Sequence, residues 1–439
     1  MKGSLLIISM PFKVGVGGFL RSYYVLPKLT RLLSENGYEV ELYIPANALR
    51  TFIKFHLRTE QDEQVSWKHS WLLDELFDSA LNEIDCLEKQ SKYTFVVNEK
   101  LLKKNIEYNR LILSREFKQA SLYNLVLSEE LRPLLIHLYE KKFVNTIGSS
   151  FSKPLYGYSM HETADAVTAL TTLSSKETKV VVLLQLDLGK RIVEKIVNIR
   201  LFENLRKKTK LVGILSVSPA PIIETPKLHR LCNNIEVLVP GLSLGEDVPC
   251  EAKLKELGTV VYYGRISKEK GIFDLLKAWR IIEKKEDAVL YITGKFEDYK
   301  TKAEFEKTIK EYGLKRVVYL GYLDRKRLFE TITRFSTLAY PSYRDSFSMT
   351  VLESLAMGLK VVAYDIPALR YIYNECRNVT LVPTGDFKQL ALNIIENLKK
   401  PFERDDTTTK FLNLYSSWEK VALEEYKHLN KLFSLDKLS

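Results

Sequence analysis

Long apolar runs are missing from this sequence of 439 residues. No run reaches the ~18 to 20 apolar residues that a helix needs to cross a bilayer, so the sequence predicts no membrane span. The apolar stretch at the N-terminus is brief and leads directly into a glycine-rich loop. This arrangement favours a first buried strand over a signal peptide.

Cysteine and histidine are scarce, and neither is clustered. The four cysteines, Cys86, Cys232, Cys250 and Cys376, lie far apart and include no Cys-x-x-Cys pair. This spacing predicts free thiols in a reducing compartment such as the cytoplasm. The six histidines show no metal-ligand spacing and no Asp-x-Asp occurs. We therefore expect neither a dedicated metal site nor a cofactor.

Acidic residues are outnumbered, with 55 Asp and Glu against 66 Lys and Arg, which gives a formal net charge of +11. A solvated lysine-rich surface accounts for such a charge. The functional alternative to this default is attraction to nucleoside diphosphates, anionic lipid headgroups or nucleic acid. Because no nucleic-acid-binding motif accompanies the charge, we expect no nucleic-acid partner.

The chain is too long for one ordinary domain, and its composition, 46% hydrophobic and 28% charged, is that of a soluble globular protein. Apolar runs alternate with helical patterns, which predicts an α/β fold with parallel sheets. The strands expected in the first half are residues 5–9, 40–44, 155–159, 180–184, 211–216 and 235–239. The charged and aromatic residues 50–145 are expected to be mostly helical.

A segment with proline, glycine and charged residues, 240–258, is predicted to link two domains. A second α/β unit follows it. Its expected strands are residues 260–264, 289–293, 317–320, 338–340 and 361–364, with helices around 275–282 and 303–312. A terminal helix at 417–432 carries Trp418, Val421, Ala422 and Leu429 on one side.

Two carboxylates, Asp345 and Glu353, flank the predicted start of a helix near Ser348. Asp345 falls on the loop before this helix, and Glu353 falls roughly one and a half turns inside it. The helix N-terminus between them is expected to offer free backbone N–H groups and a positive dipole end, which suit a phosphate. Carboxylates beside an anion site suit a ligand with both hydroxyls and phosphates, such as a nucleotide-sugar.

Together with other marks, this segment resembles the retaining glycosyltransferases of family 4, which have the GT-B fold. The family's Glu, seven residues, Glu pattern corresponds to Asp345 and Glu353, with Ser346-Phe347-Ser348 in place of the usual Gly-Phe-Gly. The remaining marks follow the family's order over residues 239–422. They are Val239-Pro240-Gly241, Tyr263-Gly264-Arg265, Glu269-Lys270-Gly271, Leu320-Gly321-Tyr322, Tyr340-Pro341-Ser342 and Ser417-Trp418-Glu419.

The resemblance implies two Rossmann-like domains with parallel sheets facing across a cleft. We expect residues 1–245 to form an acceptor-side domain and residues 246–415 to bind the nucleotide-sugar. Residues 416–439 are expected to form a helix that crosses back to the first domain. The implied reaction moves a sugar from a nucleoside diphosphate to a hydroxyl acceptor, a glycan or lipid-linked glycan, with retention of configuration and without a metal.

The family's site residues correspond to named positions in this chain. By resemblance, Arg265 and Lys270 bind the two phosphates, where they stabilise the charge that grows as the sugar departs. Each of them could otherwise be an ordinary surface cation. Glu353 would bind the ribose hydroxyls and Asp345 the sugar hydroxyls; the alternatives are a solvated helix glutamate and a helix-cap aspartate.

The loop after Asp345 departs from the family's pattern. Aspartate in place of glutamate withdraws the carboxylate by one carbon–carbon bond, about 1.5 Å. Ser346 and Ser348 replace permissive glycines on either side of Phe347, so the backbone angles of this donor-binding loop are expected to differ. The sequence therefore predicts a moved loop or a different donor sugar.

Two features of the first half are candidate donor contacts. The loop with Gly15, Gly17 and Gly18 resembles the family's glycine-rich turn after the first strand, although such a turn can be only a turn. His161 is a candidate sugar contact or an ordinary structural histidine. The family often has a histidine on the strand that corresponds to 180–187, where this chain has Gln185 and Asp187.

Basic and apolar residues alternate in the first half, as in residues 52–55 and 141–144. This pattern suits peripheral contact with the anionic inner face of a membrane, and equally suits a buried core with solvated lysines. Two rival functions remain open. One is a non-catalytic GT-B subunit that binds a ligand or partner, and the other is a nucleotide-sugar epimerase of similar fold.

Overall fold

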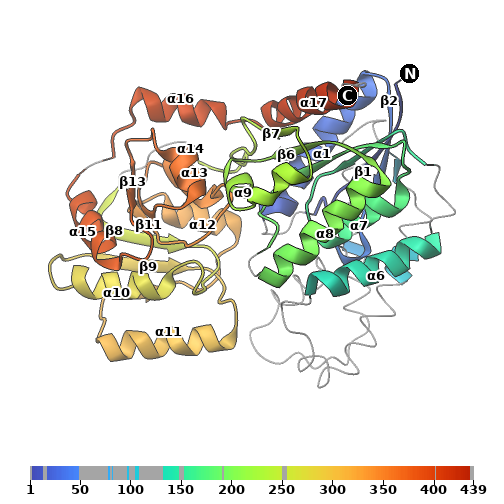
Figure 1. Cartoon of the computed structure of the whole chain (residues 1–439). Coiled ribbons are helices and arrows are strands. Elements are labelled where there is room, and N and C mark those ends of the chain that lie inside the picture. The colour runs from blue at the N-terminus through green and yellow to red at the C-terminus, as the bar shows by residue number, and fades with distance from the viewer. Residues whose placement is uncertain are drawn as a thin grey trace. The chain divides into compact units, whose positions relative to one another are not determined.

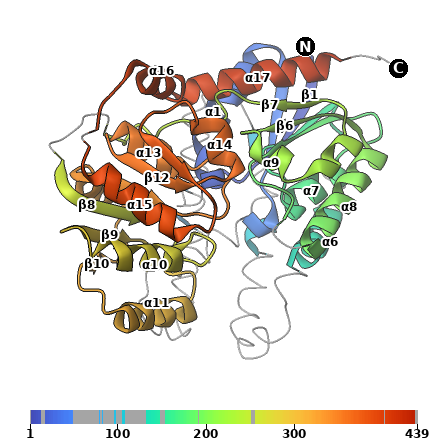
Figure 2. The ribbon, with the colours of Figure 1, turned by 60° about the vertical axis from the view of Figure 1, so that its left-hand side comes forward.

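The computed structural model of the chain forms two compact α/β units (Figures 1 and 2). Unit 1 comprises residues 1–217, 221–242 and 418–439, and unit 2 comprises residues 218–220 and 243–417. The structure describes residues 2–12, 17–48, 78–79, 82, 96–97, 104–107, 132–147, 153–189, 192–249, 255–400 and 402–435.

The described strands of unit 1 form one parallel sheet in the order β3-β2-β1-β4-β5-β6-β7. They are β1 (Gly3–Ile8), β2 (Tyr38–Tyr43), β3 (Val96–Val97), β4 (Tyr156–Ser159), β5 (Lys179–Leu184), β6 (Lys210–Ser216) and β7 (Ile235–Val237). Strands β1 and β5 are almost entirely buried, as expected for apolar runs that are covered on both faces. The order reverses direction at β1, where ligands bind in such sheets.

The helices of unit 1 cover this sheet. Among the described helices are α1 (Gly17–Glu35), α6 (Arg132–Ile147), α7 (Ala164–Leu173), α8 (Ile192–Lys208) and α17 (Trp418–Ser434), with the short α9 (Ala220–Ile223) after β6. Helices α6, α7 and α8 lie side by side in both views (Figures 1 and 2). Helix α17 packs against α1, so the C-terminal helix belongs to the unit that contains the N-terminal strand.

Apolar and ionic contacts both hold α17 in unit 1. Trp418 is buried and stacks on Tyr24 of α1, with ring centroids 5.3 Å apart. The Arg21 guanidinium pairs with the Glu425 carboxylate, and neither side chain is exposed to solvent. Tyr158 of β4 donates a 2.6 Å hydrogen bond to the same carboxylate. A buried ion pair of this kind needs such extra hydrogen bonds to offset its desolvation.

The described strands of unit 2 form a second parallel sheet, in the order β10-β9-β8-β11-β12-β13. They are β8 (Glu256–Tyr263), β9 (Val289–Thr293), β10 (Val317–Tyr319), β11 (Phe335–Tyr340), β12 (Lys360–Tyr364) and β13 (Val379–Val382). The helices are α10 (Ile272–Ile282), α11 (Tyr299–Tyr312), α12 (Arg325–Ile332), α13 (Met349–Ala356), α14 (Pro367–Tyr373), α15 (Phe387–Leu398) and α16 (Asp406–Leu414).

The fold class is confirmed, and several predicted boundaries are wrong. The linker predicted at 240–258 is too long, because β8 begins at Glu256, which pairs with Phe335 of β11. Gly258 carries a φ of 74° inside this strand, so a glycine that suggested a linker serves the strand instead. Strand β7 ends at Val237, two residues earlier than predicted. Strand β13 was not predicted, since its residues are only half-buried.

The first-half expectations are tested only in part. Residues 132–147 are helical as predicted, and Phe143 and Val144 are buried while Lys141 and Lys142 are exposed. The segment 52–55 lies outside the described residues. Cys232 and Cys376 are free and buried, and Cys86 and Cys250 lie outside the described ranges. In the part of the chain that was searched, no helix is long and apolar enough to cross a membrane.

Candidate active site

Lys270 and Asp345 meet beside the carboxyl end of β11 in unit 2. The Lys270 Nζ lies 2.8 Å from Oδ2 of Asp345 and 3.2 Å from the carbonyl oxygen of Arg344. The Tyr340 hydroxyl donates to the same Oδ2. Burial raises the pKa of the Asp345 carboxyl, but the Lys270 cation and these hydrogen bonds outweigh it and lower the pKa to about 2. Asp345 is therefore ionised at any ordinary pH.

The second oxygen of Asp345 faces the start of α13. Oδ1 accepts backbone N–H groups from Ser346 at 2.8 Å, Phe347 at 3.3 Å and Ser348 at 3.1 Å. The sequence predicted free N–H groups here for a phosphate, and this is wrong for these three, because the adjacent carboxylate satisfies them. Asp345 thus caps the loop, which was its alternative interpretation.

The backbone at Ser348 adopts the left-handed conformation, with a φ of 68°. The loop therefore keeps the geometry that a glycine would allow, and a serine adopts it instead. The Tyr373 hydroxyl holds the Ser348 carbonyl at 2.9 Å. Phe347 is buried between the rings of Tyr373 and Tyr415.

Glu353 lies inside α13 with its side chain only 6% exposed. Its Oε1 is 2.9 Å from Nη1 of Arg325, the first residue of α12. Burial raises the pKa of the Glu353 carboxyl, and the Arg325 guanidinium opposes that rise. Glu353 is therefore a buried, paired carboxylate and not the solvated helix residue of the alternative interpretation.

The loop between β8 and α10 carries Arg265 and Lys270. Both lie two residues outside these elements, since β8 ends at Tyr263 and α10 begins at Ile272. Arg265 is half exposed and lies 3.4 Å from Glu297. The loop passes so close to β11 that a Cβ on Gly271 would lie 1.9 Å from the Pro341 carbonyl oxygen. This contact brings Lys270 to Asp345.

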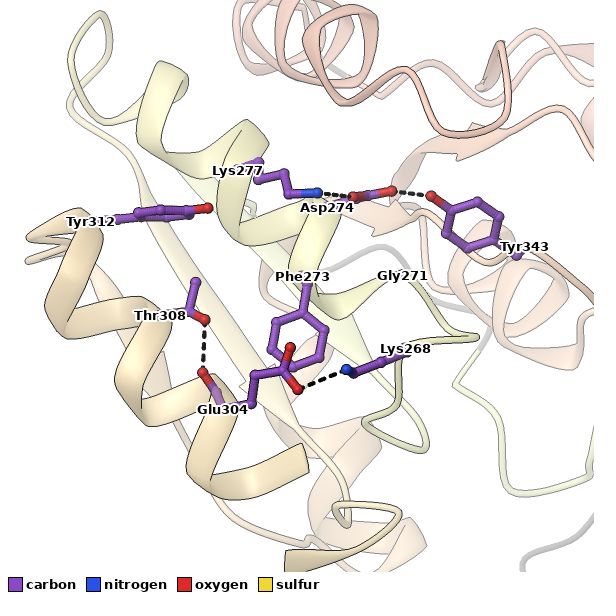
Figure 3. Close-up of a pocket in the computed structure, with 9 residues that line it drawn as sticks. All are labelled: Lys268, Gly271, Phe273, Asp274, Lys277, Glu304, Thr308, Tyr312 and Tyr343. Atoms are coloured by element: carbon purple, nitrogen blue, oxygen red, sulfur yellow. Dashed lines mark hydrogen bonds and ion pairs between the residues drawn. The ribbon is translucent and has the colours of Figure 1, made fainter. Parts of the chain in front are cut away.

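A pocket of about 390 Å³ is lined by residues of this loop, of α10 and of α11 (Figure 3). Its charged residues pair with each other: Lys268 with Glu304 at 2.8 Å and Lys277 with Asp274 at 2.9 Å. The pocket therefore offers no uncompensated cation to a phosphate. Asp274 also accepts from the Tyr343 hydroxyl, which anchors the segment before Asp345 to α10.

In unit 1, His161 follows β4 and is buried. Its Nε2 lies 2.9 Å from Oγ of Ser22, on the helix that begins at Gly17, and its Nδ1 lies 3.5 Å from Nε2 of Gln185. Burial and the Arg21 cation lower the pKa of His161 to about 3, so the ring is neutral near pH 7. The loop before Gly17 and Gly18 lies outside the described residues.

The structure places some of the predicted site residues next to each other, and it shows site residues that the sequence did not predict. It pairs Lys270 with Asp345, and it places His161 beside Gln185, at the position where the family often has histidine. Arg325 and Tyr340 were missed. Tyr340 precedes Asp345 closely in sequence, whereas no sequence signal connects Arg325 with Glu353. In the described ranges, no three His, Cys, Asp or Glu side chains gather closely enough to hold a metal ion.

Comparison with solved structures identifies the fold as GT-B. The chain is similar to a variant of S. aureus TarM in complex with fondaparinux, alpha-GlcNAc-glycerol and UDP, with a TM-score of 0.62 and 11% identity. The likeness covers 98% of this chain and 100% of that one. At this identity it shows the fold alone.

Sequence comparison is more specific for unit 2. Residues 249–411 match the family model of glycosyl transferases group 1. An uncharacterized glycosyltransferase of Methanocaldococcus jannaschii is 23% identical over 195 residues, which are 43% of this chain and 48% of that protein. The O-antigen chain mannosyltransferase B of Escherichia coli is 24% identical over 173 residues, 38% of this chain and 44% of that protein.

The chain spans about half or less of the length of the curated relatives that it matches. The family match falls on the unit that contains Arg265, Lys270, Asp345 and Glu353. Taken with the fold, it supports a glycosyltransferase of the GT-B class.

Proposed function

We propose that this protein is a retaining glycosyltransferase of the family 4 type, which moves a sugar from a nucleoside diphosphate to a hydroxyl acceptor. The observation that carries the proposal is the meeting of Lys270 and Asp345, 2.8 Å apart, at the end of β11 in the unit that matches the family model. The unit 2 domain would bind the donor. Unit 1 would bind the acceptor.

Arg265 and Lys270 would bind the diphosphate. Arg265 is half exposed and weakly paired with Glu297, so a phosphate can replace Glu297 as its partner at little cost. Lys270 donates to the Tyr340 hydroxyl and the Arg344 carbonyl as well as to Asp345, and it can turn from these toward a phosphate oxygen. Binding is strongest when the leaving group is fully charged, which lowers the barrier.

Glu353 would accept hydrogen bonds from the ribose. Asp345 would meet the sugar hydroxyls only by releasing one of its present partners, so its first task is to fix Lys270 and the loop of Ser346, Phe347 and Ser348. In the reaction, the bond between the anomeric carbon and the phosphate oxygen breaks, and the acceptor oxygen bonds to that carbon from the same face. The acceptor proton passes to a donor phosphate oxygen, so no protein base and no metal ion are required.

The acceptor would be a glycan or a lipid-linked glycan, reached from the cytoplasm or the inner face of a membrane. Helix α6 supports a shallow membrane contact, because Leu134 and Leu138 are exposed there with Lys141 and Lys142. Each cation near an anionic surface adds ~1 kcal/mol to such binding. Co-sedimentation with anionic vesicles should fall at high salt; absence of binding at low salt would favour a soluble acceptor.

A screen of thermal unfolding with UDP, GDP, ADP and their sugars tests the proposal, because a ligand that binds the native state raises the melting temperature. Release of free nucleoside diphosphate from the best donor then separates the rivals. A non-catalytic subunit would bind the donor without release, with or without acceptors. No stabilisation by any nucleotide would contradict the proposed function.

A further inference from the structure

Arg325 is held by three segments of unit 2. Its Nη1 lies 2.9 Å from Oε1 of Glu353 in α13, and its Nε donates a 2.5 Å hydrogen bond to Oδ2 of Asp247. The ring of Phe329, one helical turn further along α12, covers the guanidinium, with Cζ 4.6 Å from the ring centroid. A long, flexible side chain is thereby fixed in one place.

The two ion pairs of Arg325 differ in burial: the pair with Glu353 is buried, and the pair with Asp247 is near the surface. The Glu353 side chain is 6% exposed, whereas that of Asp247 is 45% exposed. A buried carboxylate stays ionised only when a cation and hydrogen bonds replace its water. Arg325 supplies both through Oε1. This ion pair engages Oε1, and Oε2 is the oxygen that a ligand would approach.

The place of the Arg325 guanidinium depends on Gly245 and Asp247, near the start of unit 2. A Cβ built on Gly245 would lie 2.6 Å from Nη2 of Arg325 and 2.4 Å from Oδ1 of Asp247. Gly245 is not among the glycines with positive φ, so alanine can adopt its backbone conformation. A single added methyl group would therefore displace Arg325 without changing any charge.

We propose that Arg325 is a positioning residue that holds the Glu353 carboxylate charged and aimed at the ribose of the nucleotide. Gly245 and Asp247 set the place of Arg325, so the first residues of unit 2 control nucleotide affinity. This role rests on the proposed function, in which Glu353 binds the ribose. It adds to that function a specificity for ligands with a ribose over ligands with only a diphosphate.

Calorimetry with two probes tests this role. One probe is whichever of UDP, GDP and ADP binds best, and the other is inorganic pyrophosphate, which has no ribose. Arg325→Met and Gly245→Ala should each weaken the nucleotide by roughly tenfold or more while pyrophosphate affinity changes less than twofold. The nucleotide affinity of Arg325→Lys should lie between those of Arg325→Met and the unchanged protein. Lysine keeps the cation but loses the forked guanidinium that contacts both Glu353 and Asp247.

Arg327→Met is the matched control, because Arg327 lies on the same helix, is 77% exposed and pairs with the cap residue Asp324 instead of Glu353. It should bind both probes normally. Equal losses for nucleotide and pyrophosphate in Arg325→Met would mean general damage to the unit and would overturn the role. Normal nucleotide binding by both Arg325→Met and Gly245→Ala would overturn it too. If the unchanged protein binds none of the three nucleotides, the proposed function fails, and this role with it.

Discussion

The Lys270 ammonium lies 2.8 Å from the Asp345 carboxylate, although the two residues are 75 positions apart in sequence. The cation assigned to the diphosphate is thus already neutralised by a protein anion. An incoming phosphate must share Lys270 with Asp345 or replace it. This competition would disfavour binding of stray anions while leaving a nucleotide-sugar, which offers hydroxyls as well, able to satisfy both residues.

Loss of either phosphate cation should abolish most turnover. We expect Arg265→Ala and Lys270→Ala each to lower the rate with the best donor by about 100-fold or more, because the leaving-group charge is no longer stabilised. Release of nucleoside diphosphate measures this. Lys268→Ala is the control, since Lys268 lies on the same loop but pairs with Glu304. Near-normal rates in both variants would show that the phosphates bind elsewhere.

Asp345→Asn should change the pH dependence of stability. The Asp345 pKa falls from 3.8 to about 2 on folding, so its ionisation stabilises the native state above pH 3.8, and this contribution is lost as the pH falls from there to about 2. The shift corresponds to about 2 kcal/mol at neutral pH. The melting temperatures of the two proteins should therefore differ at pH 7 and converge near pH 2. A constant difference over that range would contradict the ionisation.

Substitutions of Glu353 and Asp345 should affect the binding of the free nucleoside diphosphate and of the intact donor differently. Glu353→Gln should weaken both the free nucleoside diphosphate and the intact donor, because both contain the ribose. Asp345→Asn should impair the intact donor more than the free nucleoside diphosphate, since it alters the sugar side of the site. Calorimetry with the two ligands measures this. If both variants lose the same affinity for both ligands, the assignment of the ribose to Glu353 and of the sugar to Asp345 is wrong.

Gly271→Ala should lower the free energy of unfolding by more than the cost of placing alanine at a positive φ. Gly271 and Gly313 both have a positive φ, of 73° and 63°, but a Cβ would meet the Pro341 carbonyl only at Gly271. We expect about 1 kcal/mol for Gly313→Ala and about 3 kcal/mol for Gly271→Ala. Urea unfolding measures both. Similar values would mean that the loop moves away from β11 freely.

The buried pair of unit 1 should be costly to break. Arg21→Met leaves Glu425 buried without its cation, for which we expect a loss of about 3 to 5 kcal/mol in the free energy of unfolding. Lys28→Met is matched to it, because Lys28 also joins α1 to α17, through Glu419, but near the surface. That variant should lose under ~1 kcal/mol in urea unfolding. Equal losses would show that burial of the pair is unimportant.

The sequence predicted most of the strands and the position of the loop of Asp345, because both depend on local patterns. Apolar runs predicted β5 and β9 to within a residue, and the predicted helix start near Ser348 placed Glu353 correctly in α13. Partners distant in sequence were not predictable. The pairing of Arg325 with Glu353 depends on how α12 and α13 pack, and neither residue carries a local signal of it.

The same limit applies to the loop of Asp345. Its sequence predicted an anion site, since helix N-termini commonly bind phosphate. The side chain that ends the preceding loop is itself an anion, and at one carbon shorter than glutamate it turns back onto Ser346, Phe347 and Ser348. The sequence shows which residues form this loop, but it does not predict the direction in which the Asp345 carboxylate points.

The placement of α17 in unit 1 has a consequence for how the protein is made. Unit 2 is nearly continuous, at residues 243–417, whereas unit 1 needs residues 418–439 to complete its packing. Until those residues leave the ribosome, Arg21 has no Glu425 and Tyr24 has no Trp418 to cover it. Although residues of unit 1 precede unit 2 in the chain, the second unit can therefore reach its native state first, and a chain that stalls near residue 417 would expose an unfinished first unit to proteases and chaperones.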